Sequence, residues 1–169
     1  MLTTKIAKAT PFEGAPKINA PDIYGASTGK GVMYRIPVTG KRPIKLTVSG
    51  LADGLSFDGR DIKGVVSSDC EFTVKVTAEN ELGKNEKEIL FKIAPDNPLR
   101  TPMLGFTTWN AQRETIYQKD LEFAAECLDK SGLAEYGYSY VNVDSGWQDR
   151  YGGKYDDQHH SSVRILQAC

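Results

Sequence analysis

Two short segments in the C-terminal half carry the side chains best suited to ligand chemistry. Trp109 lies in the segment GFTTWN at residues 105–110, and Asp144 follows the segment YSYVNV at residues 138–143. An indole offers a flat apolar face and a carboxylate accepts charge-assisted hydrogen bonds, so the two could hold a ligand that has both an apolar face and polar groups. Considered separately, each has a simpler explanation, Trp109 as a packing aromatic and Asp144 as part of a turn.

The stretch between these segments has the apolar spacing of one amphipathic helix. Its apolar residues follow the pattern i, i+3, i+4 and i+7, at Leu121, Ala124, Ala125 and Leu128. Thr115, with Gln118 three residues later, predicts a capping box at the start of the helix, and Gly132 predicts its end. The order strand, helix, strand predicts a parallel βαβ unit.

The second strand of this unit, residues 138–143, should present Asp144 at its carboxyl end. The strand contains β-branched and aromatic residues and no charge, which suits burial on both faces as in parallel sheets. In a parallel α/β barrel, the carboxyl ends of the strands form the edge where side chains meet substrate. The strand order therefore predicts that Asp144 lies at an edge of this kind.

The N-terminal half has the alternation of an antiparallel β-sandwich. From Lys17 to Ala94 apolar residues recur at every second position, with turn residues at short intervals. We expect strands at residues 31–38, 44–48, 55–57, 62–66, 72–78 and 89–93. Three prolines between Ala94 and Met103 predict a stiff connector, and the change from period two to helical spacing beyond it predicts two unlike domains.

Composition and charge exclude several classes of partner. The chain is 40% hydrophobic and 25% charged, as globular proteins are, and its net charge of −1 with no block of Lys or Arg offers no attraction for nucleic acid or an anionic membrane. No apolar run approaches the roughly 18 residues that span a bilayer, and the N-terminus lacks the apolar region of a secretory signal. The three cysteines are too widely separated for a disulfide framework or a metal site, and we expect no metal or organic cofactor.

Taken together, the two segments resemble the opening of the catalytic barrel in the melibiase-like alpha-galactosidases of glycoside hydrolase family 27. In that family a Pro-Met pair precedes a GWNSWN type segment, and the second barrel strand ends in a Tyr-x-Tyr-x-x-Ile-Asp-Asp-Gly-Trp type segment. Here Pro102-Met103 precedes residues 105–110, and residues 138–147 match the second segment. The resemblance covers residues 100 to about 156 and implies the start of a (β/α)8 TIM barrel.

The resemblance implies roles for three residues. Trp109 would wall a galactose pocket, and Asp144 would bind the 4- and 6-hydroxyls of the sugar. Ser145 stands where most relatives have a second Asp, so a neutral hydroxyl replaces a charged acceptor and leaves the exact sugar open. The family hydrolyses terminal alpha-galactosides with retention, using two Asp carboxylates about 5–5.5 Å apart that come from later barrel strands. We expect no catalytic residue in this chain, and therefore a fragment that is inactive alone.

Segments of the N-terminal half resemble the immunoglobulin-like modules attached to bacterial glycosidases. They include PKINAPDIYGA at residues 16–26 and GLADGLS at residues 50–56. The organisation that follows is an N-terminal extension, an immunoglobulin-like β-sandwich, a Pro-rich linker, the start of a (β/α)8 barrel and a divergent tail, at residues 1–14, 15–95, 96–102, 103–156 and 157–169. Export to the periplasm or the extracellular space is what the resemblance implies, with alpha-galactoside oligosaccharides or polysaccharides as partners. The oligomeric state stays open.

The alternative function is a non-catalytic spacer or carbohydrate-binding module with a remnant of a barrel. Sugar binding by the sandwich would call for a strip of exposed aromatic side chains. Its aromatic residues are Tyr24, Tyr34, Phe57, Phe72 and Phe91, and several of them fit core positions. Of these two alternatives the residues favour the spacer.

Overall fold

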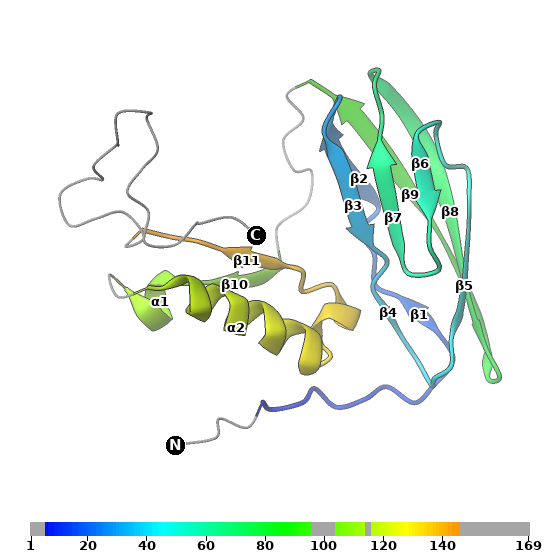
Figure 1. Ribbon diagram of the computed structural model, residues 1–169. Helices are drawn as coiled ribbons and strands as arrows, with labels where there is room; N and C mark the ends of the chain where they lie inside the picture. The colour runs from blue at the N-terminus through cyan, green and yellow to red at the C-terminus, as the bar shows by residue number, and fades with distance from the viewer. Residues whose placement is uncertain (1–5, 96–103, 114–115, 146–169) are drawn as a thin grey trace. The chain divides into compact units, whose positions relative to one another are not determined.

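The computed structural model describes residues 6–95, 104–113 and 116–145, which fall into two compact units (Figure 1). One unit consists of Ala9–Met103 and Gly132–Gly137. The other consists of Met1–Lys8, Leu104–Ser131 and Tyr138–Cys169. The predicted linker at residues 96–102 and tail at residues 157–169 lie outside the described residues.

The unit that begins at Ala9 is built from two main β-sheets. The larger sheet has the strand order β2-β9-β8-β5, formed by Ile23–Ser27, Gly83–Ala94, Cys70–Asn80 and Lys45–Ser49. The smaller has the order β3-β7-β6, formed by Gly31–Arg35, Asp61–Val65 and Leu55–Phe57. Neighbouring strands are antiparallel except that β2 runs parallel to β9. A short antiparallel pair, β1 (Lys17–Ile18) and β4 (Val38–Thr39), completes this unit together with the 3-10 helix η1 (Leu133–Tyr136).

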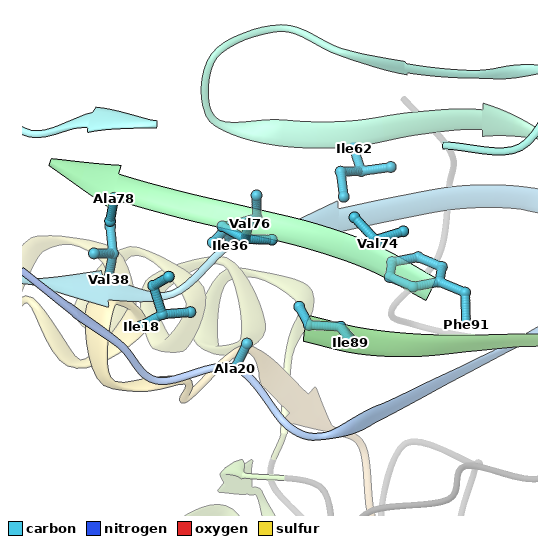
Figure 2. Close-up of a cluster of buried hydrophobic side chains, with 10 residues drawn as sticks. All are labelled: Ile18, Ala20, Ile36, Val38, Ile62, Val74, Val76, Ala78, Ile89 and Phe91. Carbon is cyan, nitrogen blue, oxygen red and sulfur yellow. The ribbon is translucent and has the colours of Figure 1, made fainter. Parts of the chain in front are cut away.

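Alternation along the strands places one apolar face of each sheet in a shared core. In β8, Val74, Val76 and Ala78 are fully buried, whereas Lys75 between them is exposed. Figure 2 shows these side chains with the other buried residues of the core. The buried cluster consists of Ile18, Ala20, Ile36, Val38, Ile62, Val74, Val76, Ala78, Ile89 and Phe91. The alternation predicted for residues 72–78 and 89–93 is therefore confirmed.

Phe91 is the centre of an aromatic group within this core. Its ring lies 4.9 Å from the ring of Tyr24 and 5.3 Å from that of Phe72, centroid to centroid. Tyr34, on β3 of the smaller sheet, meets Phe91 edge to face at 5.9 Å. Aromatic pairs at these separations stabilise beyond their buried area, so Phe91 ties the two sheets together.

One predicted strand is wrong in its extent. Residues 31–38 form two strands, since β3 ends at Arg35 and β4 begins at Val38. Pro37 lacks a backbone N–H and cannot continue a ladder, and the chain changes partners there. Ile36 donates to the Arg60 carbonyl at 3.3 Å, and the Pro37 carbonyl accepts from the Asn19 amide at 2.9 Å.

The second unit contains a parallel βαβ arrangement. Strand β10 (Gly105–Thr107) is followed by the short helix α1 (Trp109–Gln112), by α2 (Gln118–Lys130) and then by β11 (Tyr140–Asn142), which pairs parallel to β10. In Figure 1, α2 runs along this strand pair. The predicted order strand, helix, strand is confirmed. In the described part of the chain, no helix is both long enough and apolar enough to cross a membrane.

The second strand is shorter and more exposed than predicted. It spans three residues instead of 138–143, and its side chains are half-buried or exposed. Burial on both faces requires a strand or helix on each side, and among the described residues β11 pairs with β10 alone.

The predicted cap of the helix is also wrong. Helix α2 begins at Gln118 with Tyr117 as its N-cap, and the Tyr117 amide donates to the Asp120 carboxylate at 2.9 Å. A carboxylate in the first turn accepts from a free amide and, unlike the neutral side chain of Gln118, it also complements the helix dipole. Thr115 lies outside the described residues. The end of the helix is as predicted, with Gly132 in the left-handed region at φ 86°.

The two strands approach each other closely at Gly105. A Cβ atom at this residue would lie 2.0 Å from the carbonyl oxygen of Tyr140 and 2.9 Å from its Cα. The Leu104 carbonyl next to it accepts hydrogen bonds from the Ser139 amide at 3.0 Å and the Tyr140 amide at 3.2 Å. Glycine at this residue therefore permits the pairing of β10 with β11.

We predict that Phe91→Ala destabilises the full chain by about 3–5 kcal/mol, because it removes a fully buried ring and leaves a cavity. Met33→Ala, at a residue that is 76% exposed in the same unit, should change the free energy of unfolding by less than about 0.5 kcal/mol. Urea unfolding followed by circular dichroism measures both. Equal effects of the two substitutions would contradict the assigned core.

We also predict that Glu86 makes the stability depend on acid pH. Lys75 and Lys84 lie 2.9 Å and 2.5 Å from its carboxylate and lower its pKa from the ordinary 4.5 to about 2. Because the pKa is lower in the folded state, this stabilisation is present above pH 4.5 and is lost as the pH falls towards 2. Melting temperatures from pH 7 to pH 2 should show the wild-type protein and Glu86→Gln converging at the acid end. Asp53→Asn, at an exposed carboxylate, serves as control, and an unchanged gap between wild type and Glu86→Gln across this range would refute the prediction.

Gly105→Ala should separate β10 from β11. The added methyl group overlaps the Tyr140 carbonyl, so we expect amide hydrogen exchange of residues 138–145 to become at least about tenfold faster, the effect of losing about one hydrogen bond. Gly31→Ala is the matched control, since a Cβ there meets nothing within 4 Å. Unchanged exchange in Gly105→Ala would show that the strands do not need this close approach.

Candidate functional site

The carboxyl ends of β10 and β11 form one edge that gathers the predicted site residues. The register pairs Phe106 with Val141 and Thr107 with Asn142. Trp109 and Asp144 each follow two residues after the last pair of this register. Because parallel strands present their carboxyl ends on the same side, the two side chains belong to one edge although 35 residues separate them in the sequence (144 − 109).

Thr108 connects the two strands at this edge. Its amide donates to the Asn142 carbonyl at 3.2 Å, and its hydroxyl oxygen accepts from the Asp144 amide at 3.0 Å. Its own carbonyl accepts from the amides of Ala111 and Gln112 at 3.1 and 2.9 Å, which starts helix α1. The residue is only 1% exposed, and these hydrogen bonds satisfy polar groups that burial would otherwise leave unpaired.

The carboxylate of Asp144 is held in a defined orientation. Its Oδ1 atom accepts a hydrogen bond from the Ser145 amide at 2.7 Å. Asp144 is half-buried and Ser145 is exposed. A carboxylate has about four acceptor positions, so Asp144 retains the capacity to accept further hydrogen bonds from a ligand.

Trp109 is the first residue of helix α1 and remains 39% exposed. A partly open ring at the edge of a sheet can stack on an apolar ligand face.

The structure therefore places three predicted residues, Trp109, Asp144 and Ser145, just beyond the carboxyl ends of two paired strands. Sequence reasoning missed Thr108. The signal that could have found it is a hydroxyl side chain between the end of a strand and the start of a helix, a residue type that often bonds to nearby backbone. Trp147 lies outside the described residues.

Metal ligation has no candidate in the described ranges. Among residues 6–95, 104–113 and 116–145, no group of three or more His, Cys, Asp or Glu side chains is arranged to hold a metal ion.

Curated relatives match a limited part of the chain. No family model matches it. An alpha-galactosidase of Oryza sativa subsp. japonica is 38% identical over 50 residues, which are 30% of this chain and 12% of that protein. Alpha-galactosidase 3 of Arabidopsis thaliana is also 38% identical over 50 residues, 30% of this chain and 11% of that protein. The chain thus matches only about an eighth of the length of these relatives.

Solved structures match nearly the whole chain. A candidate alpha-galactosidase from Bacteroides fragilis has a TM-score of 0.80 and 31% identity, covering 92% of this chain and 33% of that one. A second, a candidate alpha-galactosidase/melibiase of the same organism, has a TM-score of 0.79 and 32% identity, covering 90% of this chain and 32% of that one. Matches this long extend over both units. The agreement of sequence and structure shows that this chain is related to the alpha-galactosidases of the glycoside hydrolase family 27 type.

Proposed function

We propose that the chain contributes part of the substrate pocket of a retaining alpha-galactosidase that acts on terminal alpha-galactosides. The observation that carries this proposal is the parallel pairing of β10 with β11, because Trp109 and Asp144 each follow two residues after the carboxyl ends of these neighbouring strands. Support also comes from the relatives, which are described as alpha-galactosidases.

The two side chains suit a sugar because they act on its different surfaces. The open face of Trp109 stacks on the apolar C–H side of the pyranose, while Asp144 accepts hydrogen bonds from the 4- and 6-hydroxyls. Ser145 is exposed beside Asp144 and adds a neutral hydroxyl, so one charged acceptor faces the sugar at this point instead of two. A single carboxylate discriminates less strongly between the axial and equatorial 4-hydroxyl than a pair of carboxylates would.

Bond cleavage belongs to two other carboxylates, one as nucleophile and one as acid and base, about 5–5.5 Å apart. They come from barrel strands beyond residues 103–156, so residues 1–169 bind substrate but do not hydrolyse it alone. The assembled enzyme works in the periplasm or outside the cell, where polymeric galactosides are accessible.

The sandwich at residues 15–95 acts as an immunoglobulin-like spacer. Its strand order, β2-β9-β8-β5 facing β3-β7-β6 with a parallel pair at one edge, supports that assignment. All five aromatic residues of this region are buried or half-buried, with Tyr24, Tyr34, Phe57 and Phe72 packed against the core around Phe91. A sugar-binding face needs exposed rings, so this observation favours a spacer over a carbohydrate-binding module.

The test isolates the natural product that contains this sequence from its source cells and assays it on p-nitrophenyl alpha-galactoside. We expect hydrolysis, and Asp144→Asn should lower kcat/KM about 10- to 100-fold, because a hydrogen bond to a charged group contributes about 1.5–3 kcal/mol. Trp109→Ala should lower kcat/KM up to about tenfold, as expected for one aromatic contact.

The control is Phe123→Ala, which removes another exposed ring of the same unit, 43% exposed on α2, and should leave kcat/KM unchanged. A product of 18.6 kDa without turnover would favour the spacer as the surviving function. Hydrolysis that is insensitive to Asp144→Asn would exclude the binding role of this edge.

A further inference from the structure

We infer that Thr108 is a positioning residue for Asp144: its buried hydroxyl holds the backbone from which the carboxylate reaches the ligand. This inference rests on the proposed function of Asp144. Thr108 is only 1% exposed and its hydroxyl oxygen accepts from the Asp144 amide, so its hydroxyl acts on a ligand through Asp144.

The geometry of Thr108 leaves little freedom at this point. Its amide bonds to Asn142 within the strand pairing, and its hydroxyl oxygen accepts from the Asp144 amide, two residues further along the same neighbouring chain segment. Its carbonyl is engaged by the first turn of α1, which begins with Trp109. One residue therefore fixes the end of β11 and the start of the helix that carries the indole.

The hydroxyl matters for a reason separate from its volume. Beyond Asn142 the strand ends, and the Asp144 amide bonds to a side chain in place of a neighbouring strand. Removing that acceptor leaves the amide without its partner and frees the segment to move. Catalytic and binding geometry is sensitive to shifts of about 1 Å, so a small displacement of Asp144 weakens its hydrogen bonds to a ligand.

A second hydrogen bond fixes the orientation of the Asp144 carboxylate. The Ser145 amide donates to Oδ1 of Asp144 at 2.7 Å, which orients the side chain relative to its own backbone. The Thr108 hydroxyl sets where the backbone lies, and the Ser145 amide sets how the carboxylate is turned. Together they orient the acceptor before a ligand arrives, which lowers the entropic cost of binding.

The test compares Thr108→Val, which has the same shape without the hydroxyl, with Thr108→Ser, which keeps the hydroxyl. Thr107→Val makes the same chemical change at the exposed neighbouring residue of β10. The first readout is amide hydrogen exchange of Asp144 by NMR in the chain of 169 residues. We expect at least about tenfold faster exchange in Thr108→Val, and exchange close to wild type in Thr108→Ser and Thr107→Val.

The second readout is the kinetics of the natural product on p-nitrophenyl alpha-galactoside. Thr108→Val should raise KM about tenfold, and Thr108→Ser should restore it. In an Asp144→Asn background, Thr108→Val should have no further effect on KM, because it acts through the carboxylate. Additive effects of the two substitutions would assign Thr108 a purely structural role and overturn the inference.

Two outcomes separate this inference from the proposed function. If the wild-type product does not hydrolyse the galactoside, or Asp144→Asn has no effect, the proposed function fails, whatever the exchange data show.

If Thr108→Val cannot fold, amide exchange of the wild-type chain still tests the inference. An Asp144 amide that exchanges at the rate of an unstructured peptide shows that Thr108 does not hold it. Faster exchange in Thr108→Val with unchanged KM also overturns the inference.

Discussion

The close approach of β10 and β11 is the constraint on which the candidate site depends. At one end of the pair, Gly105 lets the backbones meet where a methyl group would lie 2.0 Å from the Tyr140 carbonyl. At the other end, where strand pairing stops, the Asp144 amide donates a hydrogen bond to the hydroxyl oxygen of Thr108. A slip of one residue would turn the side chains to the opposite face, so the register decides which residues share the edge.

The unit that contains the sandwich depends on a different interaction, the burial of Phe91 between two sheets. The rings of Tyr24, Tyr34 and Phe72 surround it, so the aromatic residues of this unit serve its core. Its exposed strand faces carry ion pairs, such as those of Glu86 with Lys75 and Lys84. Because these rings are packed in the core, they are not available to stack on a sugar.

The hydrogen-bonding capacity of the edge beyond β10 and β11 comes from a charged side chain, Asp144, followed by a neutral one, Ser145. Asp144 is half-buried and oriented by the Ser145 amide, whereas the Ser145 side chain is exposed. A hydroxyl both donates and accepts, and it does so more weakly than a carboxylate accepts. An edge of this composition suits a polyhydroxylated ligand, with Trp109 supplying the apolar contact.

The sequence alone determined the elements, because the spacing of apolar residues is a local property. Alternation predicted β8 and β9, helical spacing predicted α2, and Gly132 predicted its end. It also pointed to Trp109 and Asp144 as neighbours at a strand edge. Predictions failed where a contact outweighed the local pattern, as at Pro37, where the chain changes partners, and at Asp120, which replaces Gln118 in the cap. Only the tertiary structure revealed the role of Thr108, because its hydroxyl meets an amide 36 residues away and such a hydrogen bond leaves no periodic trace in the sequence.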